Sequence, residues 1–247
     1  ICEDMWKPDV TECLEESGAE ILIAINGSPF EVDKSDQRLN LAVARVTEAG
    51  LPLVYVNLVG GQDELVFDGG SFVLNADRQL QAQMPAFTEG LFISKWIKSD
   101  ERWSCLKGDI EPVPGANKQI LMSIYQAMVL GLRDYVNKNH FPGIILGLSG
   151  GIDSGLSAAV AVDAIGAERV HCVMMPSPYT SKESLDDAAE QAKLLNITYD
   201  TVSIIDAMKA FESMLAPVFG KTDPDTTEEN IQARARGLII MAISNKR

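Results

Sequence analysis

The chain has 247 residues, which is room for one large domain or two modest ones. With 46% hydrophobic and 23% charged residues, its composition is that of a folded globular protein and excludes a disordered, collagen-like or disulfide-scaffold chain. The net charge of −14 disfavours binding to nucleic acid or to an anionic membrane, and no stretch approaches the roughly 18 uncharged apolar residues of a membrane span.

The first part of the chain, residues 1–106, mixes strands and helices. The apolar run at 19–25 predicts a strand covered on both faces, and helices are predicted at 8–17 and 34–49, each followed by a glycine. Turns are expected at Gly60–Gly61 and Gly69–Gly70. Further strands are predicted at 53–57, 64–67, 71–76 and 91–94.

The segment 107–117 is the best candidate for a linker between domains, since prolines and glycines interrupt any regular element there. From Lys118 a long amphipathic helix is predicted to present one apolar face, made of Leu121, Ile124, Met128, Leu132 and Tyr135.

Residues 118–247 then alternate between strands and helices. Strands are predicted at 143–148, 169–175 and 198–203, with helices at 153–165, 184–195 and from 204 onward. A capping box of Thr226 and Glu229 is expected to open a last helix. This order predicts an α/β fold with a Rossmann-like parallel sheet, right-handed crossovers and helices on both faces.

The strongest chemical motif is LGLSGGIDS at 146–154, placed where a strand turns into a helix. Gly150 and Gly151 allow the backbone to approach a ligand, the hydroxyls of Ser149 and Ser154 add donors, and the helix N-terminus favours an anion. We expect this loop to bind a phosphate or pyrophosphate. The Asp153 carboxylate would repel that group unless a divalent cation lies between them, so we expect Asp153 to be a Mg²⁺ ligand. The alternative is a plain glycine-rich turn with capping serines.

This SGGxDS loop resembles the pyrophosphate-binding loop of ATP pyrophosphatases. The segments MMPSPYTS at 174–181 and TTEENIQARARG at 226–237 resemble signature segments of NAD⁺ synthetases. The resemblance implies that ATP adenylates deamido-NAD⁺ and that ammonia then forms the amide, with AMP and pyrophosphate released. It implies that the ATP site comprises Gly147, Leu148, Ser149, Gly150, Gly151, Ile152, Asp153 and Ser154, and that Asn230 and Arg234 contact deamido-NAD⁺. For Arg234 an exposed basic helix face is the competing interpretation.

The opening ICEDMW resembles the nucleophile elbow of the carbon–nitrogen hydrolase (nitrilase) superfamily, and NGSPF at 26–30 and LPLVYVNLVGGQDELVF at 51–67 resemble its glutaminase members. The resemblance implies an incomplete α-β-β-α sandwich in residues 1–106, in which Cys2 attacks glutamine and Ser28 and Lys34 bind it. A thiolate is a strong nucleophile, although the neighbouring Glu3 and Asp4 do not lower its pKa. The Glu and Lys of the superfamily's triad precede the cysteine, so we expect this stretch alone to be inactive as a glutaminase.

The four cysteines form no CxxC pair, and the chain has only two histidines, so we expect free thiols, a reducing compartment and a cytoplasmic location. The chain does not open on a Met, and we expect a piece of a longer polypeptide that is also truncated at its C-terminal end. The expected partners are small molecules, namely ATP with Mg²⁺, deamido-NAD⁺ and glutamine, together with further copies of the chain, because an ammonia channel between domains favours a large assembly. Two alternatives stay open: another enzyme with this loop, such as a GMP synthetase-like, asparagine synthetase-like or tRNA-thiolating enzyme, and a non-catalytic nucleotide-binding fragment.

Overall fold

The computed structural model describes residues 1–108, 116–220, 223 and 225–246, which form two compact units, Ile1–Tyr135 and Val136–Arg247. The predicted linker falls mostly on residues 109–115, outside the described part. The two units divide inside a helix, at Tyr135.

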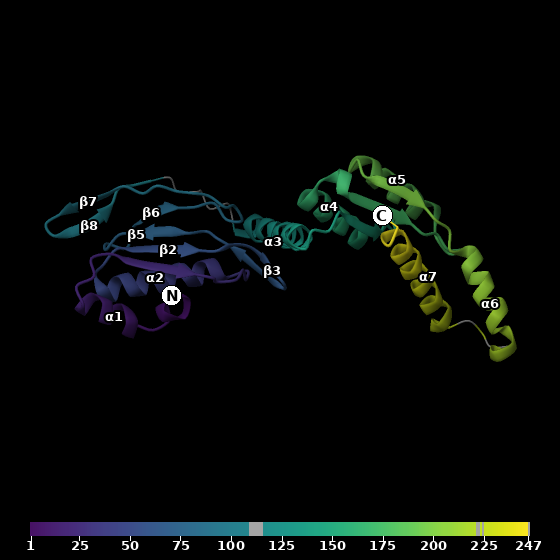
Figure 1. Cartoon of the computed structure of the whole chain (residues 1–247), viewed down its shortest axis with the longest axis horizontal. Coiled ribbons are helices and arrows are strands. Elements are labelled where there is room, and N and C mark those ends of the chain that lie inside the picture. The colour runs from purple at the N-terminus through teal and green to yellow at the C-terminus, as the bar shows by residue number, and fades with distance from the viewer. Residues whose placement is uncertain (109–115, 221–222, 224, 247) are drawn as a thin grey trace. The chain divides into compact units, whose positions relative to one another are not determined.

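The first unit is built on a four-stranded mixed sheet of order β1-β2-β5-β6, visible in Figure 1. Strands β1 (Leu22–Asn26) and β2 (Leu53–Asn57) are parallel, while β5 (Phe72–Leu74) and β6 (Leu80–Gln83) join antiparallel to them. Two hairpins extend it: β3 (Val59–Gln62) with β4 (Leu65–Asp68), and β7 (Trp96–Ser99) with β8 (Arg102–Cys105).

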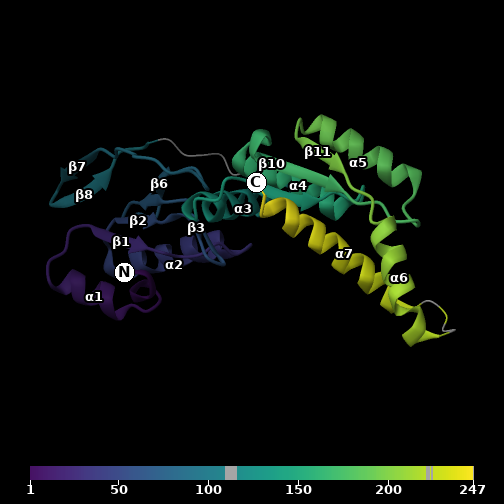
Figure 2. The ribbon, with the colours of Figure 1, turned by 45° about the vertical axis from the view of Figure 1, so that its right-hand side comes forward.

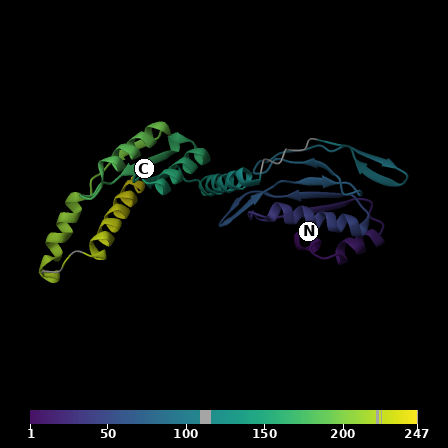
Figure 3. The ribbon, with the colours of Figure 1, turned by 180° about the vertical axis from the view of Figure 1, so that it is seen from behind.

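The helices α1 (Asp9–Glu16) and α2 (Lys34–Ala49) lie on the same side of this sheet (Figure 3). Helix α2 ends at Gly50, whose φ of 63° gives the left-handed C-terminal cap that its position predicts. Ala42 and Val46 of α2 are fully buried in a core with residues of the sheet and of the N-terminal turn, namely Met5, Leu22, Ala24, Leu53, Tyr55, Phe72 and Leu74.

Two expectations about the strands of this unit are wrong. Strand β1 is covered on one face only, because Ile23 and Ile25 are 67% and 62% exposed while Leu22 and Ala24 are buried. The helices cover only the face that carries Leu22 and Ala24. Residues 91–94 form no strand; Leu91 is 92% exposed in an irregular segment, and the strand follows at Trp96.

Gly60 and Gly61 do not form the expected turn but lie inside strand β3, with the turn at Asp63–Glu64. A Cβ on Gly61 would lie 3.0 Å from the Cα of Gly131, so this glycine serves a close approach of helix α3. Gly69 and Gly70 do adopt positive φ angles of 66° and 62°, as a turn requires.

Helix α3 runs over Ala116–Lys138, which confirms the long helix but not its buried face. Leu121 and Tyr135 are 72% and 53% exposed, whereas Ala127 and Leu130 are buried. The apolar residues that share the expected face are therefore not the buried ones, and the contact with the β3–β4 hairpin is made through Gly131 and Asp134.

The second unit is the expected alternation of strands and helices. A parallel sheet of order β11-β10-β9 is formed by β9 (Ile144–Gly147), β10 (Val170–Met174) and β11 (Thr198–Thr201). Helices α4 (Ile152–Ile165) and α5 (Lys182–Leu194) connect the strands. All five residues of β10 are buried, so both faces of this central strand are covered. Figure 2 shows β10 with helices α4 and α5 of the same unit.

Helices α6 (Ile205–Phe219) and α7 (Thr226–Ser244) complete the unit. Their apolar residues pack on Val173 of β10 together with Ile204 and Ala235. Helix α7 does begin with a capping box, but its members are Asp225 and Glu228, one residue earlier than Thr226 and Glu229. The side chain of Asp225 accepts a hydrogen bond from Thr227, which is the stronger cap because it reaches the first-turn amides.

Candidate functional site

The segment Gly147–Ser154 forms the loop between β9 and the first turn of α4, at the carboxyl end of the parallel sheet. Leu148 anchors it: its side chain is buried, and its amide donates to the carbonyl of Val173 at 3.0 Å. In open parallel sheets this edge is where ligands bind. The structure therefore brings all eight loop residues to the expected end of the sheet.

Two hydroxyl groups hold the loop in shape. The amide of Ser149 donates to Oγ of Ser154 at 3.1 Å, and the amide of Gly151 donates to Oγ of Ser149 at 3.2 Å. The two Oγ atoms are 3.0 Å apart, and Ser154 Oγ also donates to the carbonyl of Gly151 at 2.9 Å. The two serines thus hold the loop in one conformation. From the sequence alone, their hydroxyl groups were expected to donate hydrogen bonds to a ligand.

Gly150 has a φ of 81°, and a Cβ placed on it would lie 2.3 Å from the carbonyl oxygen of Ser184 in α5. Gly155, one turn into α4, faces the end of the flexible Gln191 side chain, which a Cβ there would approach to 2.5 Å and which can move aside. The contact at Gly150 is with backbone and requires glycine. The loop Gly147–Ser154 is therefore packed directly against helix α5.

The open side of the loop suits an anion. The amides of Ile152 and Asp153 belong to the first turn of α4 and have no hydrogen-bond partner within the described residues, as is usual at a helix N-terminus. Ile152 is 83% exposed, so this turn faces solvent. Free amides at a helix N-terminus are a general phosphate-binding arrangement.

Asp153 is exposed in the same turn and is the only acidic residue there. Among the described residues, no group of three or more histidine, cysteine, aspartate or glutamate side chains is arranged to hold a metal ion. A single carboxylate fits Mg²⁺ only where substrate phosphates and water supply the other ligands, which is the usual mode for nucleotide-bound Mg²⁺. The donor set therefore fits an ion that arrives with a nucleotide.

Asn230 and Arg234 lie one turn apart on α7, and both are exposed. No described contact joins either of them to the loop. Arg236 of the same helix is partly buried, and its Nε donates to the carbonyl of Met175 at 3.2 Å. The Cε of Met175 lies 3.1 Å from a Cβ placed on Gly147, so Arg236 is connected through Met175 to the nucleotide loop.

A second polar site surrounds Cys2 in the first unit. Cys2 begins a short turn, Cys2–Met5, with a φ of 52°, a backbone conformation that is uncommon for a residue with a side chain. Strain of this kind occurs where a structure holds a reactive group in a fixed direction. Lys34, the first residue of α2, has its Nζ 3.1 Å from Glu31 and 5.7 Å from the centroid of the Trp6 ring.

Ser28 lies in the loop after β1 and is buried, with every polar atom of the residue engaged. Its amide donates to Oδ1 of Asn57 at 2.9 Å, and its carbonyl accepts from Nδ2 of Asn57 at 3.1 Å. Arg38 donates through Nε to Ser28 Oγ at 3.0 Å and through Nη1 to both carboxylate oxygens of Asp68, at 2.8 and 2.9 Å. Arg38, Asn57 and Asp68 are functional candidates that the sequence reasoning missed.

Tyr55 of strand β2 is buried in the same core as Met5, the last residue of the turn that begins at Cys2. Burial raises the pKa of the Tyr55 phenol, whereas the charge of Arg38 and a hydrogen bond with the Ser28 side chain lower it. Tyr55 therefore joins the buried network of Ser28 and Arg38 to the core beneath that turn.

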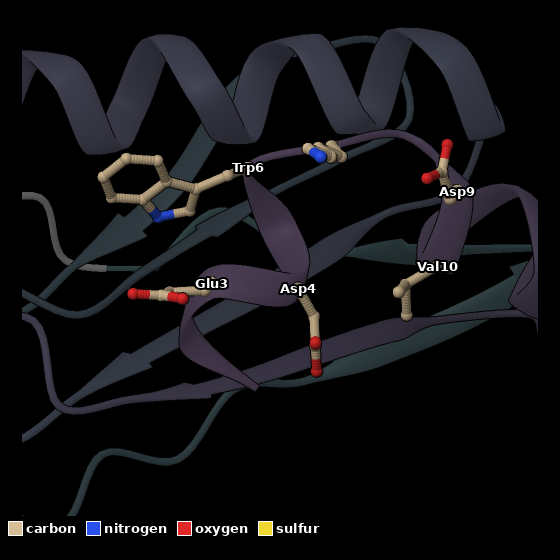
Figure 4. A pocket seen from close by; sticks show the side chains of 6 residues that line it. Glu3, Asp4, Trp6, Asp9 and Val10 are labelled. Atoms are coloured by element: carbon tan, nitrogen blue, oxygen red, sulfur yellow. The ribbon is translucent and has the colours of Figure 1, made fainter.

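An open pocket of about 360 Å³ lies beside this region on the N-terminal segment. It is lined by Glu3, Asp4, Trp6, Lys7, Asp9 and Val10 (Figure 4). None of the predicted site residues lines it, and its three carboxylates disfavour an anion. We assign it no role.

No helix in the described ranges is long and apolar enough to cross a membrane.

Residues 124–247 match the NAD synthase family, and residues 1–97 match the carbon-nitrogen hydrolase family. Over its whole length the chain is 52% identical to a glutamine-dependent NAD(+) synthetase of Rhodobacter capsulatus and 43% identical to one of Acinetobacter baylyi, and it covers 44% of each. The chain thus spans less than half the length of these relatives.

The structure is similar to that of a glutamine-dependent NAD+ synthetase from Acinetobacter baumannii in complex with ADP. The TM-score is 0.91 at 43% sequence identity, over 99% of this chain and 45% of that one. A synthetase from Cytophaga hutchinsonii, at 20% identity and a TM-score of 0.75, shares the fold over 94% of this chain and 44% of that one.

Proposed function

The chain belongs to the NAD synthase family, and we propose that it is part of a glutamine-dependent NAD⁺ synthetase that amidates deamido-NAD⁺ at the expense of ATP. The observation that carries this proposal is the preorganised loop Gly147–Ser154 at the carboxyl end of a parallel sheet, in a chain similar throughout to proteins of that name. The ADP complex of the Acinetobacter baumannii protein supports the binding of a nucleotide.

In the synthetase reaction, a carboxylate oxygen of deamido-NAD⁺ attacks the α-phosphorus of ATP, and pyrophosphate leaves. The amides of Ile152 and Asp153 and the dipole of α4 would hold the negative charge of the leaving pyrophosphate. Asp153 would hold a nucleotide-bound Mg²⁺, which neutralises phosphate charge when bound. Ammonia then attacks the acyl adenylate, and AMP leaves to give NAD⁺.

The glutaminase reaction would supply the ammonia. The thiolate of Cys2 attacks the carboxamide carbon of glutamine, the carbon–nitrogen bond breaks, and ammonia leaves. Water then hydrolyses the thioester to glutamate and regenerates the thiol. Ser28 and Lys34 would bind the substrate amino acid, and the catalytic Glu and Lys of the family precede Cys2 in the longer protein. Asn230 and Arg234 would contact deamido-NAD⁺. We also propose that the enzyme is cytoplasmic and homo-oligomeric.

The test uses the full-length protein that contains this chain, with ATP, ammonia and one acceptor at a time. Deamido-NAD⁺ should support formation of AMP and NAD⁺, whereas xanthylate and aspartate, the acceptors of GMP synthetase-like and asparagine synthetase-like enzymes, should not. Asp153→Ala should lower AMP formation at least about tenfold, as expected for loss of a group on the reacting phosphates. AMP formation unchanged in Asp153→Ala, or faster with another acceptor, would contradict the proposal.

A further inference from the structure

The side chain of Arg38 is an unusual feature of the first unit because it is charged, only 7% exposed and saturated with hydrogen bonds. A guanidinium has five N–H donors in a planar fork. Here Nε donates to Ser28 Oγ at 3.0 Å, and Nη1 donates to the two oxygens of Asp68. Nη2 donates to the carbonyls of Ser28 and Pro29, at 2.8 Å each.

Four segments of the first unit are joined here, directly by Arg38 or through Ser28. Arg38 comes from α2, Asp68 from the end of β4, Asn57 from the end of β2, and Ser28 from the loop after β1. Asp68 is also buried, so the two charges are neutralised by each other in a site with little water. Removing one partner of such a pair is costly, and the pair therefore fixes the four elements in one arrangement.

The contact with Ser28 also sets which hydrogen bonds its hydroxyl can make. A hydroxyl has one donor and two acceptor positions. Arg38 Nε occupies one acceptor position, and a hydrogen bond joins this hydroxyl to Tyr55. An arginine donor cannot accept, so the hydroxyl proton of Ser28 must point to Tyr55 or to a ligand and never to Arg38.

We infer that Arg38 is a positioning residue for glutamine: its guanidinium, neutralised by Asp68, locks the Ser28–Pro29 backbone and aims the Ser28 hydroxyl at the substrate beside Cys2. This inference rests on the proposed glutaminase activity. Lysine cannot substitute, because three rotating donors on one nitrogen cannot reach Ser28 Oγ, two carbonyls and a carboxylate at once.

Helix α2 offers a matched control. Arg45 lies two turns further along the same helix and is as buried as Arg38, but its only side-chain partner among the described residues is Glu48, at 2.8 Å. It contacts none of the residues around Cys2. Arg45→Lys therefore measures what replacing a buried arginine by lysine does to α2. Arg38→Lys has the same effect on the helix and in addition removes the guanidinium hydrogen bonds to Ser28, Pro29 and Asp68.

The experiment measures glutamine hydrolysis, ammonia-dependent NAD⁺ synthesis and amide hydrogen exchange in the full-length protein and in both variants. Arg38→Lys should raise the KM for glutamine roughly tenfold to a hundredfold, as expected for a misplaced binding group. It should leave the ammonia-dependent rate within about twofold and speed exchange of the Ser28 amide. Arg45→Lys should change none of these beyond about twofold.

A KM for glutamine in Arg38→Lys equal to that of Arg45→Lys would overturn the inference while the proposed function stands. A wild-type protein that hydrolyses no glutamine would instead contradict the proposed glutaminase, and the substrate assigned here with it. If Arg38→Lys fails to fold, Asp68→Asn tests the same lock, since it keeps the size of the partner and removes its charge. An unchanged KM in Asp68→Asn would likewise overturn the inference.

Discussion

Gly150 is the residue on which the shape of the nucleotide loop depends most closely. A side chain there costs about 1–2 kcal/mol for the left-handed backbone, and its Cβ would lie 2.3 Å from the Ser184 carbonyl oxygen. We expect Gly150→Ala to weaken ATP binding at least about tenfold, because the loop must move by enough to misplace its amides. Isothermal titration calorimetry of the full-length protein measures this directly.

Gly151→Ala is the comparison for stability. Gly151 has an ordinary φ of −89°, and a Cβ there would lie 3.4 Å from Oγ of Ser149, which is normal contact. Its free energy of unfolding should stay within about 1 kcal/mol of the wild type, as for a glycine in an accessible backbone region. Equal destabilisation by the two substitutions would show that the contact with Ser184 is unimportant.

Cys172 gives a pH dependence of stability. Burial raises the pKa of this thiol to about 11, whereas an unfolded chain ionises near pH 8.5–9, at about the ordinary value. Between these values the unfolded state binds fewer protons than the folded state, so stability must fall as pH rises from about 9 to 11, by at most about 1.4 kcal/mol per pH unit. Urea denaturation at each pH measures the slope.

Because tyrosine and lysine also titrate in this range, the informative quantity is the difference between variants. Cys172→Ala should lose the contribution and show a shallower decline, while Cys13→Ala, which removes an exposed thiol, should follow the wild type. A decline of the same slope in all three proteins would exclude Cys172 as its source.

Sequence reasoning placed the loop Gly147–Ser154 between a strand and a helix, where the structure has it, because its residues are consecutive and its conformation is local. It missed Arg38, Asn57 and Asp68, because these residues meet only when α2, β2 and β4 are assembled. One signal was present: Arg38 lies four residues before the buried Ala42, on the apolar side of α2, where an unpaired charge would be prohibitive. A charged residue in such a position requires a buried partner.

At the scale of elements, the β3–β4 hairpin is joined to α3 by two glycines and one carboxylate. The amide of Gly61 donates to Oδ2 of Asp134 at 2.8 Å, and a Cβ on Gly61 would lie 3.0 Å from Cα of Gly131. Gly61 was expected in a turn because glycine is frequent there. Glycine is equally required where two backbones approach closely, and the sequence alone does not distinguish the two uses.

We expect Gly61→Ala to lower the free energy of unfolding by about 1–3 kcal/mol, since the new methyl group meets backbone that cannot move away. Gly131→Ala should cost less, because its Cβ would meet one side-chain methyl group of Val66, 3.0 Å away, rather than backbone, and alanine is favoured over glycine inside a helix. Chemical denaturation of both variants provides the comparison. A larger loss in Gly131→Ala than in Gly61→Ala would contradict this packing.

The elements of the second unit were easier to predict than those of the first. In β9-α4-β10-α5-β11, each element follows its neighbour in space, so the chain order determines a parallel sheet once the crossover rule is applied. In the first unit, the prediction also has to say which faces of the sheet are covered by helices. The exposed Ile23 and Ile25 of β1 show that an apolar run does not specify whether one face or both faces of a strand are buried. Local periodicity indicates a strand, whereas its burial depends on the rest of the fold.

At the scale of the whole molecule, the net charge of −14 makes binding to polyanions unfavourable. We expect no shift of a DNA fragment in an electrophoretic assay, and no co-sedimentation with anionic vesicles, at physiological salt. We propose that the charge of a bound nucleotide is instead met by a few amides at one helix end. Salt-sensitive binding of DNA would show a basic surface that the composition does not indicate.

We propose that the two parts of the chain that match two families serve one reaction, in which nitrogen passes from glutamine to NAD⁺. The most direct measurement supplies the full-length protein with ATP, deamido-NAD⁺ and glutamine labelled with ¹⁵N in its amide, and analyses NAD⁺ by mass spectrometry. We predict that the label enters the nicotinamide amide, and that Cys2→Ala abolishes this transfer but keeps synthesis from free ammonia. Unlabelled NAD⁺, or transfer that survives Cys2→Ala, would contradict the account.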